Sequence, residues 1–181
     1  MTKKNVLGLS LAIPSILAFI LLLHEVFFPF VYNLKEPFFA VPIEVSEELS
    51  GAQGLPIRND EQGDGWFGAK RNGNRKHLGL DLAAKLGSPV YAAKSGWARI
   101  SNVPDGYGKL VLINHPGHWQ TRYGHLSEFA VKKLQWVRQG DVIGFIGKTG
   151  NAGSSDIVSH LHFEIRRKSE PLDPARELVK N

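Results

Sequence analysis

Two histidines close to the C-terminal end, His160 and His162, are separated by a single residue in the run SHLHFEIRR. Successive side chains of a β-strand point to opposite faces, so the two imidazoles share one face while Leu161 and Phe163 share the other. Apolar partners on the opposite face would bury the strand and keep the two rings still. Paired imidazoles of this kind suit metal binding or proton transfer.

A second pair with even spacing lies in the run HLGLD, which holds His77 and Asp81. In an extended segment these two side chains face one way, the leucines face the core, and Gly79 leaves room for an ion or a close strand. Glu164 shares the face of the first two histidines and could bind a metal or orient one of its ligands. Two histidines and one carboxylate with an open fourth position are typical of a catalytic zinc site, not a structural one.

His125 follows a strand-like segment in RYGHLS and is a further candidate, because it lies in the same small domain. For His24, His115 and His118 we expect ordinary surface or structural positions. The chain has no cysteine, which excludes disulfides, thiolate metal sites and cysteine nucleophiles. Any metal must therefore be held by histidine, aspartate or glutamate.

The elements that must position these residues are short apolar runs punctuated by glycine. Strands are expected in SPVYAAKSGWARI, KLVLINH, WQTRYGHL, VIGFIG and HLHFEIRR. Strands at this spacing with tight turns indicate an all-β domain built mainly from an antiparallel sheet. Asp173 and Pro174 can begin a helical turn as N-cap and first helical residue.

The N-terminal part is apolar and differs from the rest. Residues 6–23 carry no charge, and at about 1.5 Å per residue they nearly span a hydrocarbon layer of roughly 30 Å. Aromatic residues between Phe27 and Tyr32 suit a membrane interface, and Lys3 and Lys4 predict that the N-terminus stays in the cytoplasm. We expect an uncleaved single-pass transmembrane helix, against the alternatives of a cleaved signal peptide or a buried helix.

This pattern divides the chain into a membrane anchor with its interfacial flank (1–32), a linker rich in proline and acidic residues (33–50) and a catalytic domain (51–181). The catalytic domain would lie outside the cytoplasm, on the periplasmic or cell-wall side. The formal net charge of +5 favours anionic partners such as a cell wall, lipid headgroups or nucleic acid, and the spread of the charge does not choose among them.

Several segments in a fixed order resemble the M23 family of zinc metallopeptidases, the lysostaphin- and LytM-like peptidoglycan endopeptidases. The likeness runs from about residue 65 to residue 174. It rests on HLGLDLAAKLGSPVYAAKSGWARI, GYGKLVLINH, TRYGHLS, VRQGDVIGFIGKTG and HLHFEIR. The resemblance implies an antiparallel sheet that forms a groove for an extended peptide.

Carried over to this chain, the resemblance implies that His77, Asp81 and His162 bind Zn2+ and that His125 and His160 are catalytic. It implies hydrolysis of peptidoglycan stems or cross-links by a zinc-activated water, with no nucleic-acid partner and with protein partners undetermined. The alternatives are a weakly active or non-catalytic regulator or scaffold of cell-wall hydrolysis or envelope assembly, and a peptidase that acts on protein. The loop 151–159 is longer than usual in the family, with Ser159 where proline is common.

Overall fold

The computed structural model describes residues 15–16, 18–23, 27–45, 54–71 and 73–178. The chain divides into two compact units, Met1–Pro37 and Phe38–Asn181. In the first unit, helix α2 covers Phe28–Lys35. None of the helices in the described ranges is long and apolar enough to cross a membrane. Most of the predicted transmembrane segment, 6–14 together with residue 17, lies outside the described residues.

The described part of the first unit exposes many large apolar side chains. About half or more of the surface is accessible for Ile16, Phe19, Ile20, Leu21, Leu22, Phe27, Phe28, Phe30 and Leu34. Patches of this kind on a soluble surface mark an interaction site with protein or membrane. The exposed apolar side chains of this unit therefore offer a surface that an apolar partner could cover.

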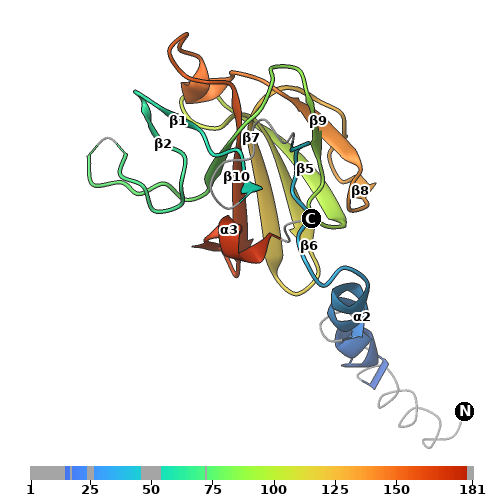
Figure 1. Cartoon of the computed structure of the whole chain (residues 1–181). Coiled ribbons are helices and arrows are strands. Elements are labelled where there is room, and N and C mark those ends of the chain that lie inside the picture. The colour runs from blue at the N-terminus through green and yellow to red at the C-terminus, as the bar shows by residue number, and fades with distance from the viewer. Residues whose placement is uncertain (1–14, 17, 24–26, 46–53, 72, 179–181) are drawn as a thin grey trace, which may run out of the picture. The chain divides into compact units, whose positions relative to one another are not determined.

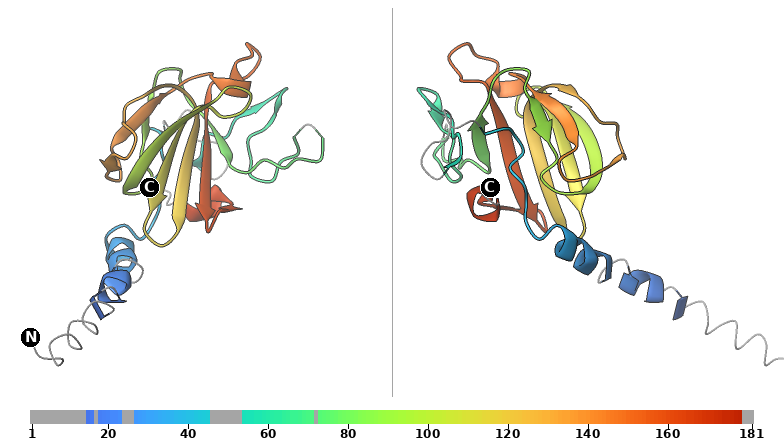
Figure 2. Two further views of the ribbon diagram at one scale, coloured as in Figure 1. Left: turned by 180° about the vertical axis from the view of Figure 1, so that it is seen from behind. Right: turned by 45° about the vertical axis from the view of Figure 1, so that its right-hand side comes forward.

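The second unit is built on an antiparallel sheet in which β11, β10, β7, β6, β5 and β8 are neighbours in that order (Figure 1). Their bounds are β5 Gly96–Val103, β6 Gly108–His115, β7 Trp119–Phe129, β8 Trp136–Val137, β10 His160–Arg167 and β11 Glu170–Leu172. The long strands lie side by side in every view (Figure 2). The predicted all-β, mainly antiparallel class is confirmed for this unit, with β10 in the interior of the sheet.

Shorter strands complete the second unit. They are β1 Asn59–Asp60, β2 Gly63–Asp64, β3 Leu80–Ala83, β4 Pro89–Tyr91 and β9 Val142–Ile146. Strand β3 pairs with β10, β9 pairs with β7 and β4, and β1 pairs with β2. The short helix α3 spans Pro174–Glu177, and the side chain of Asp173 accepts a hydrogen bond from the Ala175 N–H, as an N-cap does.

Strand alternation places the core on one face of β10. Leu161, Phe163 and Ile165 are fully buried, and the Phe163 ring lies 5.3 Å from that of Tyr123 on β7. On β3, Leu80 and Leu82 are fully buried as expected, but Leu78 is 39% exposed. The expectation that Leu78 faces the core is therefore wrong, because β3 begins at Leu80 and the preceding segment does not follow strand alternation.

The compact unit begins at Phe38, inside the segment predicted as a linker. Phe39 and Ile43 are buried in the core. The Ala40 N–H donates to the Ala93 carbonyl at 2.8 Å, and the Tyr91 N–H donates to the Pro42 carbonyl at 2.8 Å. The chain around residues 38–43 is thus packed and hydrogen-bonded as part of the domain.

The long loop after β9 is tied to the body of the domain. It contains the 3₁₀ turn η4, Gly150–Ala152. The Val158 N–H donates to the Asp60 carboxylate at 3.0 Å, and the Ser159 hydroxyl donates to the Ala84 carbonyl at 2.7 Å. Both the η4 loop and the β1–β2 hairpin reach the same end of the sheet (Figures 1 and 2). Ser159 therefore serves as a hydrogen-bonding residue where a proline could not donate through its side chain.

Candidate metal centre and active site

Three side chains from different elements meet at the end of the sheet. His162 on β10 lies directly opposite Asp81 on β3 in the antiparallel register, and His77 lies four residues before Asp81. His162 Nδ1 is 2.9 Å from Asp81 Oδ1, His77 Nε2 is 3.0 Å from the same oxygen, and the two nitrogens are 3.0 Å apart. All three residues are buried.

Hydrogen bonds on the far side of each ring fix which nitrogen faces the cluster. His77 Nδ1 donates to the Trp66 carbonyl at 2.9 Å, so its Nε2 carries the lone pair. His162 Nε2 donates to the Glu164 carboxylate at 3.1 Å, which leaves Nδ1 unprotonated in the neutral ring. Donation from a ring nitrogen to a carbonyl or carboxylate is the usual outer support of a metal-bound histidine. Glu164 therefore orients His162 in this arrangement.

The spacing of the three atoms fits a zinc ion. Ligands at about 2.0–2.1 Å from zinc with tetrahedral angles lie about 3.3 Å apart. The observed separations of 2.9 to 3.0 Å are a few tenths of an ångström shorter, a difference that small side-chain rotations remove. Two imidazole nitrogens and one carboxylate oxygen are also ligand types that zinc accepts.

Gly79 explains how His77 and Asp81 come so close to β10. A Cβ atom built on Gly79 would lie 2.3 Å from the backbone oxygen of Phe163, which no side chain tolerates. The glycine thus allows the backbone before β3 to lie against β10. The predicted close strand approach at this position is confirmed.

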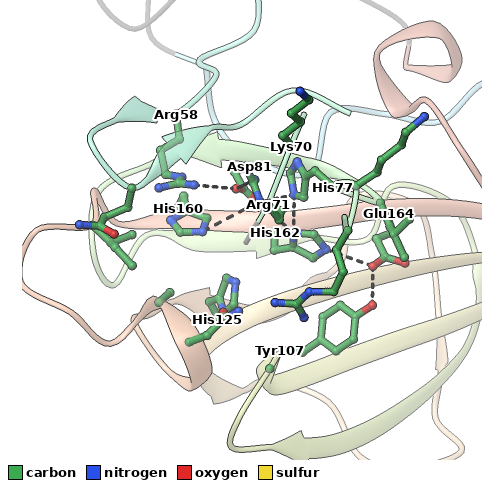
Figure 3. A pocket seen from close by; sticks show the side chains of 18 of the residues that line it. Arg58, Lys70, Arg71, His77, Asp81, Tyr107, His125, His160, His162 and Glu164 are labelled. Atoms are coloured by element: carbon green, nitrogen blue, oxygen red, sulfur yellow. Dashed lines mark hydrogen bonds and ion pairs between the residues drawn. The ribbon is translucent and has the colours of Figure 1, made fainter. Parts of the chain in front are cut away.

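Two arginines hold the other oxygen of Asp81. Oδ2 accepts hydrogen bonds from Arg71 Nη2 at 2.8 Å and from Arg58 Nη2 at 3.1 Å (Figure 3). Arg58 is nine-tenths or more buried and also donates to Asp60 at 2.7 Å. Oδ1 is thereby left to face the two histidines, which suits binding of a metal through one oxygen.

The electrostatics of the cluster favour positive charge between the three residues. Burial alone raises the pKa of Asp81, but hydrogen bonds and charge from His162 and His77 outweigh it and hold that pKa well below its usual range. Burial alone lowers the pKa of His162, yet Asp81 and Glu164 raise it to about 9. A cation bound here would gain the same attraction from the two buried carboxylates.

The remaining two histidines lie beside this cluster (Figure 3). His160 Nδ1 donates to the Val158 carbonyl at 2.7 Å, and its Nε2 is 3.9 Å from Asp81 Oδ1. His125 Nδ1 donates to the Thr149 carbonyl at 2.9 Å, and its ring centroid lies 5.0 Å from that of His160. In both rings Nε2 is therefore the unprotonated atom.

Burial keeps these two rings neutral. It lowers the pKa of His160 below its usual value. For His125, burial together with the nearby His162 and His160 lowers the pKa to about 3. At neutral pH both rings are therefore uncharged, which is the state that a proton acceptor needs, although the low pKa makes His125 a weak base.

His125 reaches the cluster through an unusual backbone conformation. Gly124 lies opposite His162 and Tyr123 lies opposite Phe163, so regular alternation would turn His125 toward the core beside Tyr123. Its φ of 63° and a register shift between β6 and β7, which gives β7 one extra residue between Tyr123 and Leu126, break the alternation, and Leu126 is fully buried in the core instead. A non-glycine residue in this region costs of order 1 kcal/mol, and such strain is concentrated at functional sites.

The five predicted residues line one cavity of about 760 Å³. The structure brings together His77, Asp81, His125, His160 and His162, while His115 is buried elsewhere and His118 is exposed. Three cavity residues that contact this group were not found from the sequence: Arg58, Arg71 and Tyr107. These three residues lie in loops or turns, where the sequence has no periodic pattern from which the direction of a side chain could be predicted.

Comparison with known proteins places these observations in a family. The model of peptidase family M23 matches residues 75–174, more than half of the chain. The DD-carboxypeptidase/endopeptidase Mpg of Neisseria meningitidis is 40% identical over 100 residues, which are 55% of this chain and 22% of that protein. The murein hydrolase activator NlpD of Escherichia coli is 34% identical over 113 residues, which are 62% of this chain and 28% of NlpD.

A solved structure is similar to this chain as well. A zinc-containing peptidase from Vibrio cholerae superposes with a TM-score of 0.58 and 30% sequence identity, over 76% of this chain and 39% of that one. This chain spans only between 22% and 28% of the length of the two curated relatives. The shared region is thus the domain that carries the histidine cluster.

Proposed function

We propose, from the premise that the chain belongs to peptidase family M23, that it is a zinc metalloendopeptidase that cuts peptide bonds in peptidoglycan stems or cross-links. One observation carries the proposal: ligand atoms of His77, Asp81 and His162 converge in the cavity that also holds His125 and His160. A binding module would need neither the open metal site nor the two additional buried histidines. The relative Mpg, named as an endopeptidase, supports this assignment.

In the proposed mechanism, His77 and His162 would hold the ion through Nε2 and Nδ1, and Asp81 would hold it through Oδ1. When bound, zinc supplies a Lewis acid and a water of lowered pKa. The unprotonated nitrogen of His160 or His125 accepts the proton of the attacking water and passes it to the leaving amine. The other ring can stabilise the oxygen on which negative charge develops only with a proton on its Nε2, because an unprotonated nitrogen cannot donate a hydrogen bond to that oxygen.

The test separates metal binding from proton transfer. His162→Ala should purify with little zinc, whereas His160→Ala and His125→Ala should retain zinc and lose turnover steeply. Zinc content is measured on the full-length protein in detergent, and activity by mass spectrometry of muropeptides after digestion. His118→Asn is a suitable control, because this exposed histidine lies outside the cavity and asparagine tolerates its φ of 62°.

Loss of zinc from His160→Ala but not from His162→Ala would reverse the two assignments. Full zinc occupancy without digestion of peptidoglycan would favour the second candidate function, a weakly active or non-catalytic regulator of wall hydrolysis. That candidate has support of its own, since NlpD, named as a murein hydrolase activator, is 34% identical to this chain. Cleavage of a protein in place of peptidoglycan would identify a different substrate for the same chemistry.

The proposal includes membrane attachment through the N-terminal unit. The uncharged run 6–23, the lysines before it and the exposed apolar side chains between Ile16 and Leu34 support an anchor at residues 1–32. The anchor would hold the peptidase domain on the extracytoplasmic side of the membrane, where peptidoglycan lies. Residues 33–37 then act as the connection, since the packed domain starts at Phe38.

A further inference from the structure

One wall of the active-site cavity is basic. The cavity is lined by five arginine and lysine side chains and three carboxylates. All five cations come from one stretch of chain just before and including the approach to β3: Arg58, Lys70, Arg71, Arg75 and Lys76. The carboxylates of Asp81 and Glu164 are occupied by hydrogen bonds from arginines and histidines within the site. Arg58 and Arg71 are among the donors to Asp81, so the cations of this wall that no ion pair of the described residues neutralises include Lys70 and Lys76.

Backbone hydrogen bonds join the two arms of a small hairpin, 68–71 and 73–77, in the outer part of this wall. The Arg71 N–H donates to the Arg75 carbonyl at 3.0 Å, and the His77 N–H donates to the Ala69 carbonyl at 2.8 Å. The Gly68 N–H closes the base of the hairpin by donating to the His77 carbonyl at 2.8 Å. The hairpin is thus continuous with His77, one of the proposed metal ligands, and its position relative to the site is fixed by backbone bonds.

Within this hairpin Lys70 and Lys76 are direct cross-strand partners. Opposed residues of an antiparallel pair point to the same side, and like charges in such a pair are destabilising. Both lysines are exposed and line the cavity. In the described part of the chain, no ion pair joins either lysine to an acidic side chain. Two repelling ammonium groups at the cavity suit a ligand that brings a negative charge.

We propose that the hairpin carrying Lys70 and Lys76 binds a carboxylate of the peptide substrate close to the scissile bond. The inference rests on the proposed peptidase function and specifies its substrate: a peptide with a free carboxylate is preferred over the same peptide with that group amidated. Figure 3 shows Lys70 above the cluster, on the side of His77 and Asp81, whereas His125 and Tyr107 lie on the opposite side. A peptide that crosses the cluster would pass the basic hairpin at one end.

Exposed ion pairs set the size of the expected effect. A single exposed pair contributes about 0.2–1 kcal/mol, which is a factor of about 1.4 to 5. Two such contributions that add on one carboxylate give a preference of between about twofold and thirtyfold in kcat/KM. Such a preference should shrink at 0.5 M salt, because exposed charges are screened over a few ångströms at high ionic strength.

The experiment uses two synthetic peptides that differ only in a carboxylate or a carboxamide next to the bond that is cut. The preference is the ratio of their kcat/KM values, measured for the full-length zinc-loaded protein and for the double variant Lys70→Gln/Lys76→Gln. Lys132→Gln/Lys133→Gln is the matched control, because these two exposed lysines lie outside the cavity. Arg71 is left unchanged, because it contacts Asp81.

We expect the native protein and the control to prefer the carboxylate peptide by between about twofold and thirtyfold, and the Lys70/Lys76 double variant to lose most of that preference. Equal rates for both peptides in the native protein would overturn the inference. So would a preference that survives in the double variant, since the carboxylate would then be bound elsewhere, for instance by the metal.

A binding measurement keeps this inference separate from the proposed function. Calorimetry with the His160→Ala protein, in which turnover should be low, gives the affinity of each peptide with and without the two lysine substitutions. If no variant cuts either peptide or peptidoglycan, the peptidase proposal fails, and the affinity ratio still decides the carboxylate site. If peptides are cut but the affinity ratio is unaffected by the lysines, the carboxylate site fails and the peptidase proposal stands.

Discussion

Replacing Glu164 by glutamine keeps the size of the side chain but removes the charge that faces His162. Glu164 is fully buried, and its two oxygens have different partners. Oε1 accepts from His162 Nε2 at 3.1 Å and from the Tyr107 hydroxyl at 2.5 Å, while Oε2 accepts from Arg166 Nε at 2.7 Å. All these partners are donors, so a glutamine amide must point its NH₂ group at one set of them.

The cost of this mismatch should be visible in zinc affinity. If the amide nitrogen faces His162, the ring loses the bond that orients Nδ1 toward the metal. If the amide nitrogen faces Arg166, its N–H groups and the Arg166 Nε–H are two donors that repel each other. This repulsion pushes the carboxamide toward the His162 ring. Outer partners of metal-bound histidines contribute 10–100-fold in metal affinity, or about 1.4–2.8 kcal/mol. We expect the zinc dissociation constant of Glu164→Gln to rise by that factor.

The assay is competition for zinc with a chelator of known affinity, on protein whose folding is checked by circular dichroism. Tyr107→Phe is the matched control, because it removes one neutral donor to the same carboxylate and leaves the charge in place. Its effect should be clearly smaller. A folded Glu164→Gln protein that binds zinc as tightly as the native chain would refute the argument that Glu164 positions His162.

Three further outcomes are expected. Burial lowers the pKa of His115 to about 4 from 6.5, so its neutral form is stabilised by folding, and the unfolded chain binds more protons between these values. Unfolding free energy should thus fall by about 3 kcal/mol as pH drops from 6.5 to 4, and His115→Gln should flatten that slope in denaturant titrations. Phe163→Ala removes a fully buried ring and should cost about 3–5 kcal/mol in the same measurement. A reporter fused after Asn181 should be active only in the form that works outside the cytoplasm, and activity in the cytoplasmic form would exclude the proposed topology.

The geometry on β10 could be predicted because it depends on strand alternation alone. His160 and His162 line the cavity, and Leu161 and Phe163 are fully buried in the core, as alternation requires. The period of two is set by backbone geometry and is insensitive to what surrounds the strand. One face of this strand therefore lies in the cavity and the other in the core, as the sequence indicates.

Other contacts could not be predicted, because they depend on the tertiary fold. Arg58 and Arg71 reach Asp81 from segments 23 and 10 residues away, through long side chains with many rotamers. Phe39 and Ile43 lie in a stretch rich in proline, which resembles a spacer until the core that covers them is known. Local sequence contains no information about partners that only the folded sheet brings near.

His125 shows where pattern and function diverge. Alternation along β7 would place its ring in the core beside Tyr123, and only the backbone at φ 63° turns it to the cavity. The register shift between β6 and β7 that spans His125 lets Leu126 take the core position, and the histidine side chain lines the cavity. The His125 N–H still donates to the Tyr107 carbonyl at 2.7 Å, which holds the unusual conformation in place. Packing alone favours the regular strand, so a strained residue that keeps its hydrogen bond and lies beside the proposed metal site is what selection for chemistry would retain.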